Sequence, residues 1–359
     1  MHPALRTRLC DLLGVDYPIV QTGMGWVATP ELVTGSCNAG AFGFLAGATL
    51  RPDEIEPAIL RVKAGTDRPF GVNFLMEQPN AEQVVDLIIR HGVRVAGYNR
   101  APNPKLIERL KAAGVVCMPT IGARRHAQKA VQLGADVLIA QGGEGGGHTG
   151  SVPTSLLLPQ VVNAVDVPVV GAGGFRDGRG LVAALAFGAS GIAMGTRFLM
   201  TAESRVPAAT KEHYLAASVD DTVVTRRIDG LPQRLIRVGL VLELERSGPL
   251  SLYWRALRSA LEYRKLAGAS LLEVLRSGLS MRRSQGLSPA QMLMAANEPV
   301  MVREALVAGH SDRGILPTGQ VTGLIEDVPT CADLVGRIIA EAEHVLNQLA
   351  GAPIPAAGE

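Results

Sequence analysis

The first two-thirds of the chain alternate short, almost wholly apolar runs with longer segments in which apolar residues recur every three or four positions. Short apolar runs predict strands buried on both faces, and the longer pattern predicts amphipathic helices. We therefore expect eight strands, at residues 18–21, 42–46, 70–74, 93–97, 115–119, 137–141, 167–172 and 191–194. The predicted helices between them span residues 30–38, 53–64, 81–91, 104–113, 123–133, 155–165 and 178–187.

Glycine stands at the end of several predicted helices, at Gly40, Gly92, Gly114, Gly134 and Gly188. Glycine is the usual residue just past a helix because it adopts the left-handed backbone conformation without a steric penalty. Eight strands alternating with helices favour the α/β class and a (β/α)8 TIM barrel. An open, doubly wound sheet is the alternative topology.

The pattern changes near Thr225, where arginine becomes frequent and we expect no further strands. Leucines predict a helix over residues 250–279, as part of a helical insertion over the barrel mouth. The chain then returns through residues 314–320, and a helix over residues 331–349 is expected to close the barrel. The predicted organisation is therefore a barrel at 1–224, an Arg-rich insertion at 225–313 and a return segment with the closing helix at 314–350. The tail after residue 350 is expected to be frayed.

Composition narrows the class of protein. With 359 residues the chain can bury a large core, and 35 Lys and Arg against 33 Asp and Glu give a net charge of +2, which provides no global argument for nucleic-acid binding. The four cysteines form no CxxC pair, so neither a disulfide framework nor a zinc site is indicated and a cytoplasmic location is expected. The start lacks a signal-peptide pattern and no apolar run is long enough to span a membrane.

The most unusual segment runs from Ala140 to Gly150, where five glycines precede one histidine, His148. The segment follows a predicted strand, so it lies at the carboxyl end where α/β proteins place their active sites. Glycines let the backbone approach a ligand, and an imidazole there can act as general acid, general base or hydrogen-bond donor. A structural or surface histidine is the alternative. Glu144 is expected to bind backbone or orient neighbours, and no histidine spacing indicates a metal.

Other predicted strand ends also carry glycine or carboxamides. Gly171–Gly174 and Met194-Gly195-Thr196 follow the last two strands, where barrels commonly bind phosphate. Arg176 replaces the final glycine of a dinucleotide fingerprint, so a mononucleotide is favoured. Asn73 and Gln141 suit the alternating donors and acceptors of a flavin ring. Ordinary tight turns and polar strand caps are the alternatives.

With these residues in place, the chain resembles the nitronate monooxygenase (2-nitropropane dioxygenase-like) family of FMN-dependent barrels. The matching pieces begin at Pro18, Pro69, Ala140, Ala172 and Met194, and the resemblance covers roughly residues 5–349. It implies FMN at the carboxyl face of the barrel, with His148 as the active-site histidine. The implied FMN-binding residues are Gly23, Met24, Asn73, Gln141, Gly146, Gly147, Ala172, Gly173, Gly174, Met194, Gly195, Thr196 and Gln320.

Within this family the chain is similar to enzymes of steroid C/D-ring degradation that act on CoA thioesters. The features are the segment 21–27, the full glycine loop and the Arg-rich insertion with residues 293–297. Gly145 stands where the common family loop has alanine, a departure that bears on the substrate. The insertion is basic, and its cations could hold CoA phosphates or form a solvated face. They are Arg226, Arg227, Arg234, Arg237, Arg246, Arg255, Arg258, Arg264, Lys265, Arg276, Arg282 and Arg283.

The expected function is therefore FMN-dependent hydride transfer at a C–C/C=C bond of an acyl-CoA, with NAD(H) as redox partner. Oxidation of alkyl nitronates with O₂, as by nitronate monooxygenase, is the alternative, and NAD(P)H:quinone reduction is a further one. A barrel that binds a phosphorylated metabolite without redox work is the alternative outside enzymes. A small-molecule substrate and a homodimer are expected, without nucleic-acid or membrane partners.

Overall fold

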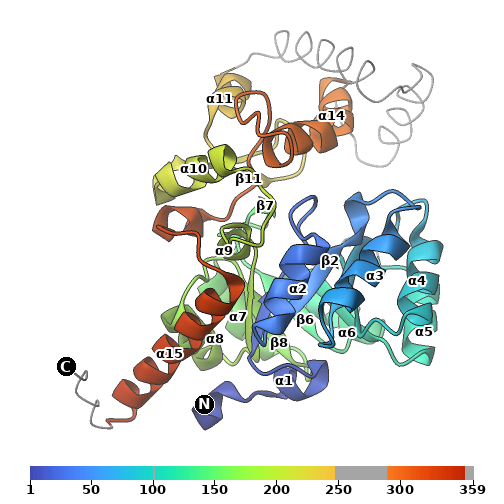
Figure 1. Cartoon of the computed structure of the whole chain (residues 1–359), viewed down its shortest axis with the longest axis vertical. Coiled ribbons are helices and arrows are strands. Elements are labelled where there is room, and N and C mark those ends of the chain that lie inside the picture. Colours follow the sequence, from blue (N-terminus) through green and yellow to red (C-terminus); the bar gives the residue numbers. More distant parts are fainter. Residues whose placement is uncertain (100–101, 247–288, 352–359) are drawn as a thin grey trace. The chain divides into compact units, whose positions relative to one another are not determined.

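A computed structural model describes residues 1–99, 102–246 and 289–351 and divides the chain into two compact units (Figure 1). The barrel unit comprises Met1–Gly145, Thr149–Arg205 and Leu324–Glu359. The second unit comprises Gly146–His148 and Val206–Gly323. The chain thus enters the second unit twice, once for three residues of the glycine loop and once for a long insertion. The predicted insertion at 225–313 lies within this second unit, and the predicted helix at 250–279 lies outside the described residues.

Eight parallel strands form a closed barrel in the order β1-β2-β3-β4-β5-β6-β8-β9. Pairing of β1 with β9, in which Val20 lies opposite Ala193, closes the ring. This confirms the (β/α)8 barrel and excludes the open sheet. The strands are β1 (Ile19–Gln21), β2 (Phe42–Ala46), β3 (Gly71–Leu75), β4 (Val95–Asn99), β5 (Val116–Ile121), β6 (Leu138–Gln141), β8 (Val169–Ala172) and β9 (Gly191–Met194).

Helices surround the barrel, and several of them end at the glycines from which the sequence predicts helix ends. Gly40, Gly92, Gly114, Gly134 and Gly188 all have positive φ, as the sequence predicts. The final helix α15 (Cys331–Leu349) packs against α8 and α2, the helices that flank the closing β9–β1 pair. The other long helices are α2 (Pro30–Asn38), α3 (Ile55–Gly65), α4 (Ala81–Arg90), α5 (Pro104–Ala112), α6 (Arg124–Gln132), α7 (Thr154–Val162) and α8 (Gly178–Ala186).

Side chains fill the barrel interior, so it is a core and not a pore. Phe44 lies edge-on to Phe42, with ring centroids 5.1 Å apart. A Cβ at Gly71 or Gly97 would lie 2.5 or 2.7 Å from the Phe44 ring, so these glycines make room for it. Helix α1 (Arg8–Leu13) adds Leu9, Cys10 and Leu13 to the same apolar cluster, and Thr7 Oγ1 donates to Ser190 O just before β9. The amino end of the barrel is therefore covered, which leaves the carboxyl end for ligands.

The second unit contains a three-stranded antiparallel sheet, so the expectation of no strands after Thr225 is wrong. Its order is β10 (Thr222–Thr225), β11 (Gln233–Ile236) and β7 (Gly147–His148). Helices α10 (Ala208–Ala216), α11 (Gly239–Arg246) and α14 (Pro289–Leu306) belong to the same unit. Buried Tyr214 donates its hydroxyl to Pro317 O at 3.0 Å, which ties α10 to the return segment. These strands are short and carry polar residues among the apolar ones, so they lack the continuous apolar runs of the barrel strands.

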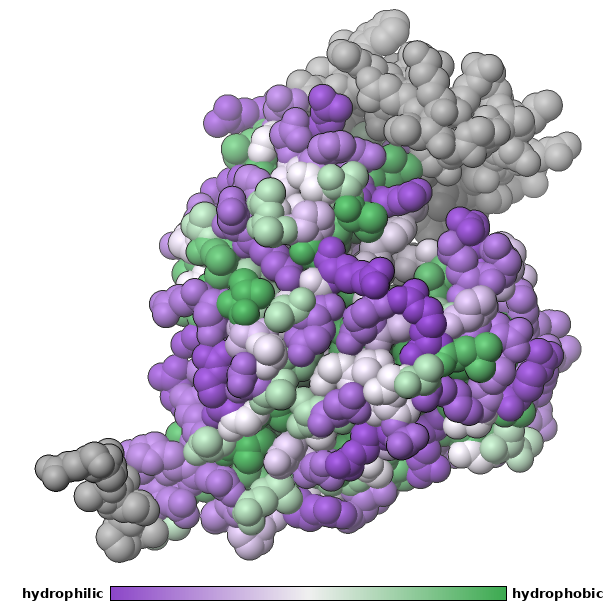
Figure 2. Space-filling model, in the orientation of Figure 1, coloured by the Kyte–Doolittle hydropathy of each residue, from purple (hydrophilic) through white to green (hydrophobic). Residues whose placement is uncertain are grey.

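The surface mixes hydrophilic residues with small hydrophobic groups on the face drawn in Figure 2. The exposed large apolar residues, such as Leu60, Leu156 and Val307, come from different segments of both units. Singly scattered apolar residues are normal on a protein surface and need no ligand to explain them. In the part of the chain that the structure describes, no helix is both long and apolar enough to cross a membrane.

Candidate active site

Asn73, in β3, lies inside the barrel at its carboxyl end. A Cβ built on Gly23, which follows β1, would lie 2.4 Å from Asn73 Cβ. A Cβ on Gly97, its register partner on β4, would lie 3.3 Å from Asn73 Nδ2. Because β1 and β3 are not neighbours in the barrel, a side chain that approaches both Gly23 and Gly97 must lie in the interior. The carboxamide therefore occupies the space that these two glycines leave.

The loops after β9 and β1 meet beside it. A Cβ on Gly195 would lie 3.3 Å from Thr22 Oγ1 and 3.4 Å from Met24 Sδ. Met194 ends β9, and Thr196 begins the short helix α9 (Thr196–Leu199). Since β9 and β1 are parallel neighbours, their carboxyl ends bring these predicted residues together.

The turn after β8 carries the second predicted phosphate segment. Gly173 and Gly174 have φ angles of 98° and 82°, which glycine adopts at no steric cost. A Cβ at Gly173 would lie 3.1 Å from both Gly145 N and Thr154 Oγ1. Ala172, the last residue of β8, accepts a hydrogen bond from Gly142 N at 2.9 Å. The turn is therefore packed directly against the start of the glycine loop.

Gln141, the last residue of β6, lies under the glycine loop. A Cβ at Gly145 would lie 2.6 Å from Gln141 Nε2 and 2.9 Å from its Cδ. A methyl group at position 145 would therefore have to displace this carboxamide. The contact gives a physical reason for glycine where the family loop commonly has alanine.

Glu144 caps a helix. Its Oε2 accepts hydrogen bonds from Thr154 N at 2.9 Å and from Thr154 Oγ1 at 2.7 Å, at the first residue of α7. A carboxylate is favourable at a helix N-terminus because it pairs with unsatisfied N–H groups and the helix dipole. Thr154 Oγ1 also lies 3.1 Å from Gly173 O. Glu144 therefore holds the glycine loop to α7 and to the turn after β8, which is a structural role.

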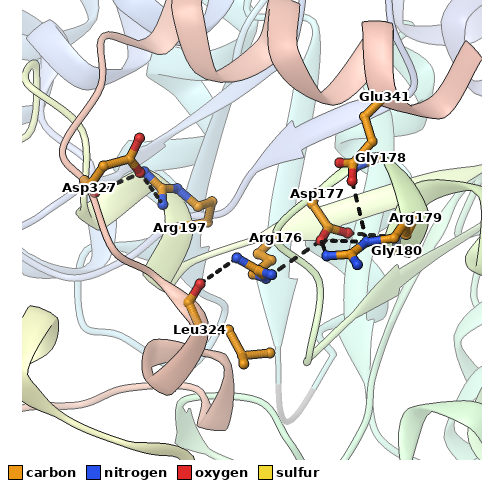
Figure 3. A network of polar contacts seen from close by, with 9 residues as sticks. All are labelled: Arg176, Asp177, Gly178, Arg179, Gly180, Arg197, Leu324, Asp327 and Glu341. Carbon is orange, nitrogen blue, oxygen red and sulfur yellow. Dashed lines mark hydrogen bonds and ion pairs between the residues drawn. The ribbon is translucent and has the colours of Figure 1, made fainter. Parts of the chain in front are cut away.

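A polar network ties the loops after β8 and β9 to the returning chain (Figure 3). Arg176 donates to Leu324 O, and Arg197 pairs with Asp327 at 3.0 Å while its side chain is 5% exposed. Asp177 Oδ1 accepts from Gly180 N at 2.9 Å and so caps α8. Burial opposes ionisation of Asp177, but the Gly180 N–H and the Arg179 guanidinium outweigh it and lower its pKa. These contacts hold both glycine turns in place.

Gly146, Gly147, His148 and Gln320 belong to the second unit. Gly147 has a φ of 62°, and a Cβ on Gly146 would lie 2.5 Å from Gly319 N, so the loop backbone lies directly on the return segment. Gln320 begins the 3-10 helix η4 (Gln320–Leu324) that follows. His148 lies opposite Gln233 in the β7–β11 pair. The histidine is thus placed by a strand pairing and not by a free loop.

His148 is the end of a polar cluster. His148 Nε2 lies 2.6 Å from Asp229 Oδ2 and 3.1 Å from Gln233 Nε2. Gln233 Nε2 donates to Glu298 Oε1, in α14, at 2.9 Å. The side chain of Asp229 is 10% exposed and that of His148 38%, so the pair reaches from the interior of the unit to its surface. The side-chain nitrogen and oxygen atoms of His148, Asp229 and Glu298 that could bind a ligand lie within 4.8 Å of one another.

Sequence reasoning missed Asp229, Gln233 and Glu298. Asp229 lies 81 positions from His148, and no local spacing links the two. The available signal was the Asp229-Gly230 pair, a common turn dipeptide, which stands between β10 and β11; Gly230 has a φ of 82°. Recognising that hairpin would have placed a carboxylate beside a strand, but not beside this histidine.

The remaining predicted groups have other outcomes. All four cysteines are buried, and burial raises the pKa of the Cys37, Cys117 and Cys331 thiols to about 12, so these three are not nucleophiles.

Among the insertion arginines, Arg234 donates to Thr222 Oγ1 at 2.9 Å within the β10–β11 hairpin. Arg255, Arg258, Arg264, Lys265, Arg276, Arg282 and Arg283 lie outside the described residues.

Comparisons with known proteins show which relatives this chain has. The (3aS,4S,5R,7aS)-5-hydroxy-7a-methyl-1-oxo-octahydro-1H-indene-4-carboxyl-CoA dehydrogenase of Rhodococcus jostii is 52% identical over 345 residues, which cover 96% of this chain and 98% of the relative. A probable nitronate monooxygenase of Staphylococcus saprophyticus is 34% identical over 277 residues, 64% of this chain and 78% of the relative. The structure of FabK from Thermotoga maritima matches with a TM-score of 0.77 at 33% identity and covers 96% of this chain and 99% of its own.

The family described as nitronate monooxygenase matches residues 6–86 and 81–341 of the sequence. This match spans nearly the whole barrel unit and the insertion. The resemblance inferred from the strand-end motifs is therefore confirmed. The chain is an oxidoreductase that belongs to the nitronate monooxygenase family.

Proposed function

We propose that this chain is an FMN-dependent oxidoreductase that transfers hydride at a C–C/C=C bond of an acyl-CoA, with NAD(H) as redox partner. The observation that carries the substrate class is the match over nearly its full length to a CoA-ester dehydrogenase, whereas the match to a nitronate monooxygenase covers 64% of the chain. The barrel alone would serve many chemistries, so the extent of the match, which includes the insertion, is the discriminating feature.

The strand ends of the barrel unit fit FMN. Gly173, Gly174 and Gly195 follow the last two barrel strands and carry no side chains, so no Cβ shields their backbone N–H groups from a phosphate. Asn73 has its carboxamide inside the barrel, where it can meet the polar edge of a flavin. These features match the chemistry of a ligand that is anionic at one end and carries alternating donors and acceptors at the other.

We assign roles on that basis. Backbone N–H groups of Gly173, Gly174 and Gly195 would hold the phosphate together with the Thr196 hydroxyl, and Ala172 and Met194 would support the two turns. Gly23, Met24, Asn73 and Gln141 would line the ring and ribityl chain. Gly146, Gly147 and Gln320 stay predicted FMN-binding residues. Bound FMN supplies the hydride acceptor and donor.

His148 would hold the proton of the reaction. Forming a C=C bond beside a thioester removes a proton from the α-carbon and a hydride from the β-carbon, and reduction adds both back. The hydrogen bond to Asp229 orients the imidazole for this proton transfer. General acid–base catalysis of this kind typically contributes about 10²- to 10⁴-fold to the rate.

Three further expectations stay predictions. The insertion arginines would bind CoA phosphates, because guanidinium groups pair with phosphate oxygens bidentately. A homodimer is expected. A cytoplasmic location agrees with four buried cysteines whose thiols are free.

Nitronate oxidation is the second candidate, and family membership favours it. In that reaction His148 would contact an alkyl nitronate, O₂ would replace NAD⁺ as the oxidant, and the CoA-binding arginines would have no function. The two candidates therefore differ in co-substrate and in the need for a CoA group.

The test is the visible spectrum of the purified protein, followed by anaerobic addition of NADH with and without an unsaturated acyl-CoA. We expect yellow absorbance that bleaches with NADH and recovers with the acyl-CoA. Absorbance that ignores NADH and bleaches with propionate 3-nitronate would move the assignment to the monooxygenase. A protein that stays colourless after incubation with FMN would contradict both.

A further inference from the structure

We propose that Asp229 is a positioning residue that holds the His148 imidazole through Nε2 and stabilises its protonated form during proton transfer. The proposal rests on the proposed function of His148 as the proton-handling group. It adds a partner that no motif in the sequence marks and that lies in a different segment of the second unit.

The contact distances fix the direction of the hydrogen bond. At 2.6 Å, His148 Nε2 and Asp229 Oδ2 must share a proton, and an ionised carboxylate has none to give. In the alternative arrangement Nε2 is unprotonated and accepts a hydrogen bond from the Gln233 amide at 3.1 Å. Its lone pair would then face the negatively charged carboxylate at short range, which is repulsive. Nε2 therefore carries the proton, and in the neutral ring the lone pair lies on Nδ1. The same carboxylate then balances the positive charge when Nδ1 is protonated.

Asp229 is held in its ionised form. Burial alone would raise its pKa, but hydrogen bonds and charge from His148, the Leu231 N–H and the Gln233 amide outweigh burial, and the pKa is lowered. Leu231 N donates to Asp229 Oδ1 at 3.0 Å, which leaves Oδ2 directed at the imidazole. Each carboxylate oxygen thus has a defined partner.

Gln233 connects this pair to Glu298. Its amide donates to Glu298 Oε1 at 2.9 Å and it is 1% exposed, so its orientation is fixed. Besides Asp229, the charged groups near His148 among the described residues include Glu298 on α14 and Arg234 on β11, whose register partner on β7 is Gly147. Arg234 directs Nη1 to Thr222 Oγ1, along the hairpin. Asp229 contacts the ring directly through Oδ2, whereas Glu298 binds the Gln233 amide.

The experiment compares Asp229→Asn with Asp312→Asn, an exposed aspartate of the same unit. In Asp229→Asn we expect kcat for the acyl-CoA reaction to fall at least about tenfold with KM changed less than twofold, because orientation and charge balance act on the proton-transfer step. Asp312→Asn should change neither. FMN absorbance and thermal melting of both variants report folding separately. An Asp229→Asn variant with wild-type kcat would overturn the proposal.

A mutant cycle tests whether Asp229 acts through His148. In a His148→Gln background, Asp229→Asn should cause no further loss of kcat, because the group that it positions is absent. Additive losses would mean that Asp229 acts elsewhere. If only a nitronate is turned over, the same cycle is measured with that substrate, so failure of the acyl-CoA assignment does not remove the test.

An assay without substrate separates the proposal from the proposed function. The Nε2–H proton resonance of His148, assigned by its loss in His148→Gln, should move upfield in Asp229→Asn, because a hydrogen bond to a carboxylate is shorter and stronger than one to an amide. Asp229→Glu should recover part of this shift, since it restores the charge. An unchanged Nε2–H resonance in Asp229→Asn would overturn the proposal even in an active enzyme.

Discussion

Trp26 has a backbone conformation that a tryptophan rarely adopts. Its φ is 61°, and it is the only non-glycine residue with positive φ among those the structure describes. Left-handed backbone costs an L-residue about 1–2 kcal/mol, so the neighbours must hold it there. Trp26 N donates to Thr49 Oγ1 at 3.2 Å, and Ala28 N donates to Met24 O at 2.9 Å. The strain lies in the loop that follows β1, at the end of the barrel that carries the proposed FMN residues.

Comparing Trp26→Gly with Trp26→Ala measures this strain. Both variants remove the indole, but only glycine relieves the backbone, so we expect Trp26→Gly to be more stable by about 1 kcal/mol. At an ordinary φ the order would be reversed, because glycine has more entropy to lose. Urea unfolding of the two variants gives the difference directly. Equal midpoints would show that the loop relaxes once the indole is gone.

Gly145 acts through a neighbouring side chain. In Gly145→Ala the new methyl must displace the Gln141 carboxamide, because the added Cβ would stand 2.6 Å from Gln141 Nε2. If Gln141 binds the flavin, losing one hydrogen bond weakens FMN binding by about tenfold. Fluorescence titration of the FMN-free protein measures the dissociation constant. Gly336→Ala, where a Cβ meets nothing within 4 Å, should leave it unchanged. Wild-type affinity in Gly145→Ala would remove Gln141 from the flavin site.

At the scale of elements, the sequence predicts the barrel well because every barrel strand is largely buried on both faces. Such strands read as apolar runs, and β2, β8 and β9 are wholly buried. The helix ends follow from glycine at fixed positions. The second sheet could not be predicted in the same way, because β7 is two residues long and lies within a glycine loop. Its strand character comes from pairing with β11, in which Gln233 lies 85 residues beyond His148.

The candidate site likewise has a part that the sequence predicts and a part that it does not. Residues at barrel strand ends could be predicted, since parallel strands bring all their carboxyl ends to one face. Asn73 and Gly97 are register partners for that reason. The partners of His148 come from a turn and from β11, and their positions depend on tertiary packing of the second unit. No periodicity encodes such packing.

The Glu144 cap is a connection between elements that stability measurements can test. Glu144→Gln keeps the shape but removes the charge that meets Thr154 N, so we expect a loss of about 1 kcal/mol in the free energy of unfolding. Because Thr154 also approaches Gly173 O, FMN retention should fall in parallel. Glu108→Gln, an exposed site on α5, is the matched control and should change stability by less than about 0.5 kcal/mol. A loss of activity without a loss of stability would make Glu144 a catalytic group instead.

At the scale of the molecule, the chain leaves the barrel unit at Arg205 and re-enters it at Leu324, so a long insertion separates β9 from α15. The returning segment that begins at Leu324 lies between this insertion and α15 in the chain. Arg176 and Arg197, each just past a glycine turn, attach it to the barrel through Leu324 O and Asp327. The contacts that attach the returning segment to the barrel therefore also hold the two turns that we propose to bind phosphate.

These contacts make the stability of the barrel unit sensitive to acid. Burial raises the pKa of Asp327, but bonds and charge from Arg337 and Arg197 outweigh it and lower the pKa, as Gly180 and Arg179 do for Asp177. A carboxyl group whose pKa is lowered in the folded state stabilises the protein at pH values above the pKa of the unfolded state, about 3.9. That contribution is lost as the pH falls through the lower pKa of the folded state. We therefore expect the free energy of unfolding to decline below about pH 4.

The double variant Asp177→Asn/Asp327→Asn tests the assignment. It should be less stable than the wild-type protein at pH 7, and the difference should shrink as the pH falls below about 4, where the wild-type carboxylates also lose their charge. Urea unfolding at a series of pH values measures both. Asp67→Asn, an exposed aspartate of the same unit, should follow the wild-type curve. A difference that stays constant down to about pH 2 would mean that the two aspartates stabilise the return segment through shape and hydrogen bonding, not through charge.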